Sequence, residues 1–272
     1  MADDVLAPWF ERWALTPDGE PFSTKFGSRL APVRWRGRAA MLKVANGEEE
    51  RRGGSLMVWW GGEGAAQVFA AEDPAILLER LSGPRSLAAM AEGGADDEAT
   101  RILCRTAMRL HAPRPEPPPA TLFPMPRWFA SLWPAAEAHG GTYALAAVVA
   151  RELLATPREA AVMHGDLHHD NLLDGEDRGW LVIDPKGVIG ERGFEYANLF
   201  RNPSAAMALE PGRMRRRAAI VIAETGLERD RLFRWIFAYA ALGAAWSLES
   251  GHDQDAAVGL QIAEIAAAEL GP

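Results

Sequence analysis

The residues whose types and spacing suit chemistry best lie in the segment HGDLHHDNLL and in the run WLVIDP that follows it. Asp166 and Asn171 belong to the first segment and Asp184 to the second. One aspartate can orient an attacking hydroxyl and accept its proton, while an amide oxygen and a second carboxylate hold the Mg²⁺ that bridges the phosphates of ATP. We therefore predict transfer of the terminal phosphate of ATP, with Asp166 as the catalytic residue and Asn171 and Asp184 as Mg²⁺ ligands.

A short hairpin is expected to bring the two metal ligands together. Residues 172–173 read as a strand, residues 174–177 as a polar turn, and residues 180–183 as a returning apolar strand. Mg²⁺ takes few protein oxygens and keeps the rest of its shell for water and phosphate. One asparagine and one aspartate are therefore a sufficient protein contribution.

Two other interpretations of this segment compete with the kinase hypothesis. The histidines among acidic residues could form a zinc or di-metal cluster, because imidazole and carboxylate are ordinary ligands of such ions. The adjacent His168 and His169 lack a Cys-rich or His-x-x-x-His partner, which weighs against this. A polar surface turn with local backbone caps is the second alternative, and it leaves Asp184 unexplained.

A lysine upstream has the setting that phosphate binding requires. Residues 30–35 and 39–44 read as two strands around the turn 36–38, and Lys43 lies near the end of the second. An acidic helix start follows, where a carboxylate can orient the lysine toward the α and β phosphates. Glu49 and Glu50 are both available, and we choose Glu50 because Met57 lies on its helical face; a solvated lysine on the polar face of the strand is the alternative.

A loop over the phosphates is predicted at residues 23–28, with Ser23, Thr24 and Gly27 as its cofactor-binding residues. No Walker motif competes with it. Two further strands, residues 67–71 and 75–79, complete a lobe of about five strands and one helix.

HGDLHHDNLL together with VIDPKGVIGERGFEYANLF resembles the aminoglycoside and hydroxyurea antibiotic resistance kinases, and most closely the streptomycin 6-phosphotransferases. The resemblance implies a Mg²⁺- and ATP-dependent (or GTP-dependent) kinase with a hinge at Glu79, Arg80 and Leu81 that binds adenine. It also implies that Glu195, with His164, supports the catalytic loop. Eukaryotic protein kinases have Phe-Gly after the last aspartate, where this chain has Pro185-Lys186, which argues for a constitutively assembled site.

The resemblance implies a cationic antibiotic as the acceptor, with streptomycin, phosphorylated at its 6-hydroxyl, as the first choice. Glu191, Glu249 and Asp253 are the candidate acids for binding it, although a solvated helix end explains the last two equally well. Glu191, Arg192 and Lys186 are expected to face the docked acceptor. The alternatives are a kinase of hydroxyurea, of another aminoglycoside or of a sugar-like metabolite, and a nucleotide-sensing protein without catalysis.

Composition narrows the class of protein further. A formal net charge of −8 disfavours nonspecific nucleic-acid binding, and the basic cluster of Arg213, Arg215, Arg216 and Arg217 is expected to be a solvated helix face. No apolar run approaches the length of a membrane span and no signal peptide is recognised, so a cytoplasmic protein is expected. A monomer is favoured. Cys104 lies in an amphipathic pattern and is expected in the core.

The predicted fold is α+β and two-lobed, protein-kinase-like, with a small antiparallel β lobe carrying one helix and a larger, mainly helical lobe. The nucleotide-binding lobe is expected to span residues 1–81 and the catalytic and substrate-binding lobe residues 82–272. Helices are predicted at residues 96–111, 144–155, 213–225, 228–250 and 253–270. The proline-rich run at residues 113–119 is expected to be a surface excursion of the larger lobe, with a domain linker as the alternative.

Overall fold

The computed structural model describes residues 5–24 and 27–271. The chain forms two compact units. The first unit contains the described residues up to Pro84 together with Pro113–Leu122 and Leu173–Gly187. The second contains Arg85–Ala112, Phe123–Leu172 and the chain from Val188 onward. The lobe boundary expected at residues 81 and 82 stays a prediction.

The first unit is built on a six-stranded antiparallel sheet with the order β1-β3-β4-β6-β5, in which β2 also pairs with β3. Strand β4 alternates strictly between its two faces, since Ala40, Leu42 and Val44 are buried in the core and Lys43 lies on the opposite face. The strands are β1 (Thr16–Pro17), β2 (Phe22–Ser23), β3 (Arg29–Trp35), β4 (Arg38–Val44), β5 (Val68–Glu72) and β6 (Ala75–Glu79).

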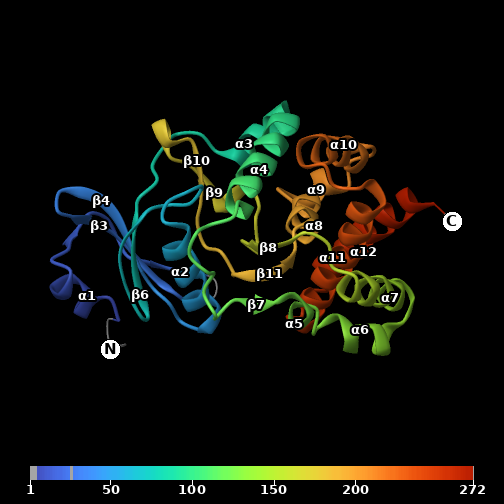
Figure 1. Cartoon of the computed structure of the whole chain (residues 1–272), viewed down its shortest axis with the longest axis horizontal. Helices are drawn as coiled ribbons and strands as arrows, with labels where there is room; N and C mark the ends of the chain where they lie inside the picture. Colours follow the sequence, from blue (N-terminus) through green and yellow to red (C-terminus); the bar gives the residue numbers. More distant parts are fainter. Residues whose placement is uncertain (1–4, 25–26, 272) are drawn as a thin grey trace. The chain divides into compact units, whose positions relative to one another are not determined.

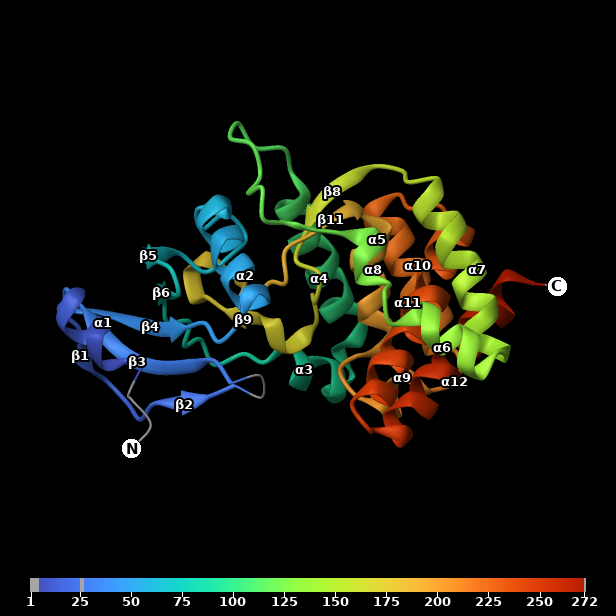
Figure 2. The same cartoon turned by 90° about the horizontal axis from the view of Figure 1, so that it is seen from below.

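Two helices accompany this sheet. Helix α1 (Ala7–Arg12) brings Trp9 and Phe10 against the core on one face. Helix α2 (Glu48–Trp60) lies beside the sheet (Figures 1 and 2). It begins with three glutamates, whose charges favour the positive end of the helix dipole, and ends at Gly61 in the left-handed region. Glu50 lies on the buried face of α2, and Gly53 and Met57, three and seven residues later, lie on the same face.

The proline-rich run belongs to the first unit, so our expectation that it is an excursion of the larger lobe is wrong. Trp59 explains why: its Nε1 donates to the Glu116 carbonyl at 3.0 Å, and the Arg114 guanidinium lies 4.8 Å from the centre of its ring. The same unit holds the hairpin of β9 (Leu172–Asp174) and β10 (Trp180–Val182).

The second unit is mainly helical and contains a three-stranded sheet in the order β7-β11-β8. Its centre is α11, whose alanines, aromatic residues and leucines are buried on nearly all sides because α7, α8 and α12 pack around it (Figure 1). The elements are α3 (Leu87–Met90), η1 (Ala91–Ala95), α4 (Asp96–His111), β7 (Phe123–Pro124), α5 (Met125–Trp128), α6 (Leu132–His139), α7 (Gly141–Ala155), β8 (Ala160–Met163), η2 (His169–Asn171), β11 (Val188–Glu191), α8 (Gly193–Ala197), η4 (Asn198–Arg201), α9 (Ala205–Ala208), α10 (Arg213–Thr225), α11 (Arg229–Glu249) and α12 (Asp253–Leu270); η3 (Glu176–Arg178) lies in the first unit.

The structure confirms the predicted α+β class, with an antiparallel sheet in one unit and helices in the other. Cys104 is fully buried, as predicted, and burial raises the pKa of its thiol to about 12. The prediction for the basic cluster is wrong for two of its members, because Arg213 and Arg217 are buried. Within the described residues, no helix combines the length and the apolar character needed to cross a bilayer.

Candidate active site

The loop of residues 164–171, called here the catalytic loop, is held by a buried carboxylate from α8. Glu195 accepts hydrogen bonds from the backbone N–H of His164 at 2.6 Å and from that of Gly165 at 3.0 Å. Burial by itself would raise the pKa of Glu195, but the nearby His111 and His164 and the Gly165 N–H lower it below its ordinary value. Glu195 is therefore ionised and fixes the backbone that leads to Asp166.

Asp166 is oriented by its own loop and by an asparagine that sequence reasoning missed. Its backbone N–H donates to Nδ1 of His164 at 3.2 Å. Asn198 donates from Nδ2 to Oδ1 of Asp166 at 3.0 Å and to the Leu167 carbonyl at 3.2 Å. The second oxygen, Oδ2, lies 3.8 Å from Nε2 of His168. Asn198 thus engages Oδ1 of Asp166 and leaves Oδ2 outside this hydrogen bond.

Asn171 has a geometry that suits a Mg²⁺ ligand. Its Nδ2 donates to the backbone carbonyl of Asp166 at 2.9 Å, which fixes the orientation of the amide. This bond uses the amide nitrogen and leaves Oδ1 on the other side of the amide as a possible ligand. Hard cations such as Mg²⁺ prefer oxygen ligands of this kind. The same hydrogen bond couples the amide to the loop that carries Asp166.

In the first unit, Lys43 forms ion pairs with Glu50 and with Asp184. Lys186 joins this charge cluster, with its Nζ 3.3 Å from Glu49, 3.6 Å from Glu50 and 3.5 Å from Asp184. The structure therefore pairs Lys43 with Glu50, the carboxylate chosen from the sequence, whereas Glu49 pairs with Lys186. Lys186 does not face an acceptor as expected, because its ammonium is occupied by these acids.

The backbone of Asp184 is unusual, because φ is +57° and lies in the left-handed region that few residues other than glycine adopt. Aspartate and asparagine tolerate this region better than most residues. Such conformations gather at functional sites, where the surrounding structure holds them in place. The conformation and the carboxylate together fit the role of a metal ligand.

The predicted phosphate loop is a tight turn at the end of β2. Thr24 donates its N–H to the Ser28 carbonyl at 2.9 Å and accepts from the Gly27 N–H at 3.0 Å. Ser23 Oγ accepts a hydrogen bond from Arg29 at 2.9 Å. Residues 25 and 26 of the predicted loop lie outside the described residues.

The predicted hinge follows β6. The N–H groups of Glu79 and Arg80 already donate to the carbonyls of Gln67 and Ala39. The Glu79 side chain binds Arg178 and the Arg80 side chain binds Asp18, so neither reaches outward for a nucleotide.

Glu191 is buried and fully engaged, contrary to our expectation that it faces the acceptor. It pairs with Arg231, accepts from Trp235 Nε1 at 2.7 Å and accepts from the Arg158 N–H at 2.9 Å. Burial would raise its pKa, but these donors hold the pKa below the ordinary value. Arg192 binds Glu159 and the Thr225 carbonyl in the same way, so both residues stabilise the second unit instead of facing an acceptor.

The other two candidate acids are exposed in the second unit. Glu249 accepts a hydrogen bond from Ser131 Oγ at 2.8 Å at the end of α11, and Asp253 begins α12. In the part of the chain that the structure describes, no three His, Cys, Asp or Glu side chains are grouped so that they could hold a metal ion. The alternative of a zinc or di-metal cluster thus has no ligand set there.

Each unit thus holds side chains of the types that phosphoryl transfer requires, with Lys43 paired to Glu50 in the first and Asp166 oriented by Asn198 in the second. The structure superposes on a ternary complex of a thermostable mutant of aminoglycoside phosphotransferase APH(4)-Ia with ADP and hygromycin B, with a TM-score of 0.69 at 13% identity, covering 98% of this chain and 99% of the other. The fold is therefore protein-kinase-like.

The sequence profile described as Aminoglycoside/hydroxyurea antibiotic resistance kinase matches residues 12–251. The chain belongs to this family, and it is an ATP-dependent phosphotransferase with a hydroxyl acceptor. It is 50% identical to the streptomycin 3''-kinase of Klebsiella pneumoniae over 89% of this chain and 91% of that protein. It is 30% identical to the streptomycin 6-kinase of Streptomyces griseus over 91% of this chain and 83% of that protein.

Proposed function

We propose that this chain inactivates streptomycin by transferring the γ-phosphate of ATP to the 3''-hydroxyl. The observation that carries the proposal is the 50% identity to a streptomycin 3''-kinase over nearly the whole chain. The 6-kinase of Streptomyces griseus is 30% identical, so the comparison supports the 3''-hydroxyl over the 6-hydroxyl predicted from the sequence.

In the proposed reaction, Asp166 orients the acceptor hydroxyl and takes its proton on Oδ2, because Oδ1 is held by Asn198. Lys43, oriented by Glu50, contacts the α and β phosphates. Asn171 and Asp184 would hold Mg²⁺, which when bound neutralises charge on the phosphates. Phosphoryl transfer needs this positioning and charge neutralisation and no covalent intermediate on the protein.

We expect the acceptor to be recognised through its charge. Streptomycin carries two guanidinium groups, which pair with planar carboxylates through parallel hydrogen bonds. Glu249 and Asp253 are exposed acids of the second unit and remain the candidates for this role. Replacing Glu249 by Gln or Asp253 by Asn should raise the KM for streptomycin more than it lowers kcat.

The test is to incubate the purified protein with Mg·ATP and streptomycin and to locate the phosphate by mass spectrometry and by ¹H–³¹P correlation. Coupling of phosphorus to the 3'' proton is the expected result, and the Asp166→Asn protein is the control. Coupling to the 6 proton would restore our sequence-based prediction. Phosphorylation of hydroxyurea without any phosphorylated streptomycin would replace the proposed acceptor while leaving the enzyme class intact.

Expression in a susceptible bacterium gives a second, independent readout. We expect streptomycin resistance to rise and kanamycin resistance to stay nearly unchanged, because the cations of kanamycin are amines on a different skeleton. Equal protection against both drugs would contradict the proposed acceptor.

A further inference from the structure

The basic run GRMRRRAA places two arginines of α10 inside the protein. Arg213 and Arg217 are only 2% and 1% exposed, whereas Arg215 and Arg216 lie on the surface. One helical turn separates the two buried side chains, so they share a face. Burying a charge is costly unless it is paired and hydrogen-bonded, so this face requires partners.

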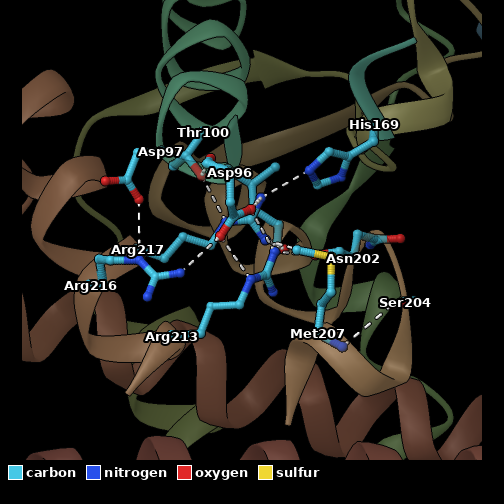
Figure 3. A network of polar contacts seen from close by, with 11 residues as sticks. Asp96, Asp97, Thr100, His169, Asn202, Ser204, Met207, Arg213, Arg216 and Arg217 are labelled. Carbon is cyan, nitrogen blue, oxygen red and sulfur yellow. Dashed lines mark hydrogen bonds and ion pairs between the residues drawn. The ribbon is translucent and has the colours of Figure 1, made fainter. Parts of the chain in front are cut away.

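Asp96, at the start of α4, is the first of these partners. Both of its oxygens accept from Arg213 at 2.8 Å, in the paired geometry that suits a guanidinium and a carboxylate. The same carboxylate lies 3.9 Å from Nη2 of Arg217. Figure 3 shows Asp96 between the arginine side chains, with Thr100 beside it.

Arg217 uses its remaining donors on the surroundings of Asp166. Nη2 donates to Nε2 of His169 at 3.1 Å, and Nη1 donates to the carbonyls of Leu199 and Asn202. Nε donates to Thr100 Oγ1 at 2.9 Å, which ties the guanidinium to α4.

These contacts join the two segments that set the position of Asp166. His169 belongs to the catalytic loop, between Asp166 and Asn171. Leu199 follows Asn198, whose amide binds the Asp166 carboxylate. A single guanidinium therefore holds both the loop that carries Asp166 and the 3₁₀ turn η4 that orients its side chain.

His169 can accept this hydrogen bond only as a neutral imidazole. The ring is 1% exposed, and the Arg217 guanidinium has donors only, so Nε2 must be the acceptor in this contact. Its proton must then lie on Nδ1, which makes no hydrogen bond among the described residues.

We propose that Arg217 is a positioning residue for phosphoryl transfer, which acts through His169 and the Asn198 turn to fix the orientation of Asp166. The proposal rests on the assignment of Asp166 as the catalytic base. Displacements near 1 Å from the reacting geometry can lower a rate by about 10²-fold. Loss of the Arg217 hydrogen bonds should therefore reduce kcat without weakening nucleotide binding in proportion.

The test uses Arg217→Met, which keeps the length of the side chain and removes its donors, and His169→Leu, which removes the acceptor. We expect kcat to fall by about 10- to 100-fold in each, with the KM for ATP changed by no more than about twofold. Arg215→Met is the matched control, since this arginine of the same helix is exposed and pairs with Glu269, which contacts neither Arg217 nor Asp96. Its kcat should equal that of the wild type.

A double-mutant cycle separates positioning from general stability. Every assay is run at a temperature where unfolding curves show the variant fully folded. Carrying both substitutions should lower kcat no further than the worse single one, because both break the same contact. Independent, additive falls in ln kcat would overturn the proposal, and so would losses explained by the unfolded fraction.

His169→Gln provides a rescue, because its amide oxygen can replace Nε2 as the acceptor. We expect His169→Gln to recover most of the kcat lost in His169→Leu, and equal kcat in the two would overturn the proposal. The comparison of His169→Gln with His169→Leu tests the proposal even if Arg217→Met fails to fold. Failure of the underlying function would look different, since the Asp166→Asn protein would then keep full activity.

Discussion

A glycine in helix α2 offers a sharp test of how the metal-ligand segment is positioned. A methyl group added at Gly53 would stand 2.1 Å from the carbonyl oxygen of Pro185, the residue that follows Asp184. A carbon and an oxygen approach to about 3.3 Å at closest, so Gly53→Ala must push this carbonyl away by about 1 Å. Because Asp184 is bonded directly to Pro185, its carboxylate should move as well.

Gly53→Ala should therefore lower kcat by about 10²-fold and raise the Mg²⁺ concentration needed for half-maximal rate. Alanine favours the helix by about 1 kcal/mol over glycine, while a forced overlap in a packed site costs about 1–3 kcal/mol. The free energy of unfolding should consequently change little or fall slightly. Steady-state kinetics across a Mg²⁺ titration and urea unfolding measure the two effects separately.

Gly54→Ala is the matched control in the same helix. Its added methyl would lie 3.8 Å from Ile76 Cδ1, an ordinary van der Waals contact. We expect up to about 1 kcal/mol of added stability and wild-type kinetics. If the two variants had the same kcat and the same Mg²⁺ dependence, the inferred link from Gly53 to Asp184 would be refuted.

Three further outcomes are expected. Asp166→Asn should lower kcat by about 10²- to 10⁴-fold while ATP binding, followed by calorimetry, stays intact; full activity would remove Asp166 from the mechanism. Lys43→Met should raise the KM for ATP and leave streptomycin binding unchanged, and a selective loss of streptomycin binding would show that Lys43 is misassigned. Because the Glu191 pKa is lowered on folding, its stabilisation is present above its ordinary value of 4.5 and is lost as pH falls through the folded value. The difference in unfolding free energy between the wild type and Glu191→Gln should therefore be largest near neutral pH and narrow on acidification below pH 4.5; a constant difference would contradict this.

Local patterns in the sequence predicted much of the fold. Helices α4, α10 and α12 have the predicted bounds, because apolar spacing and flanking glycines or acids mark both ends. Strand β6 also begins and ends as predicted. The short elements β7, β8 and β11 were not foreseen, since two to four residues carry too little periodicity and are defined by their partners across the sheet.

In the candidate site, the roles that follow from residue type and local spacing were easier to predict than the roles that depend on packing between elements. The pairing of Lys43 with Glu50 follows from helical spacing. The roles of Asn198 and Arg217 depend on contacts between elements far apart in the chain, and the sequence offered only weak hints. Asn198 lies one helical turn after Glu195, and the spacing of Arg213 and Arg217 in a helix with apolar neighbours is that of a shared buried face.

Electrostatic expectations failed where burial decided the outcome. Glu191 was expected to face the acceptor and Arg217 to lie on a solvated helix face, because charged residues are almost never buried unless they are paired. Each is buried with a specific partner network that a single sequence does not reveal. Separate ion pairs account for the wrong expectation that Lys186 and Arg192 face an acceptor, since Lys186 binds Glu49 and Arg192 binds Glu159.

The left-handed backbone at Asp184 limits which substitutions this position tolerates without a change in backbone conformation. Asparagine keeps the backbone conformation at little cost, so Asp184→Asn would report on the lost charge alone. Alanine adds a conformational penalty of about 1–2 kcal/mol, and a β-branched residue such as valine adds more. Loss of resistance in an Asp184→Val isolate would therefore combine the loss of the proposed metal ligand with a distorted backbone, and drug susceptibility alone could not separate the two.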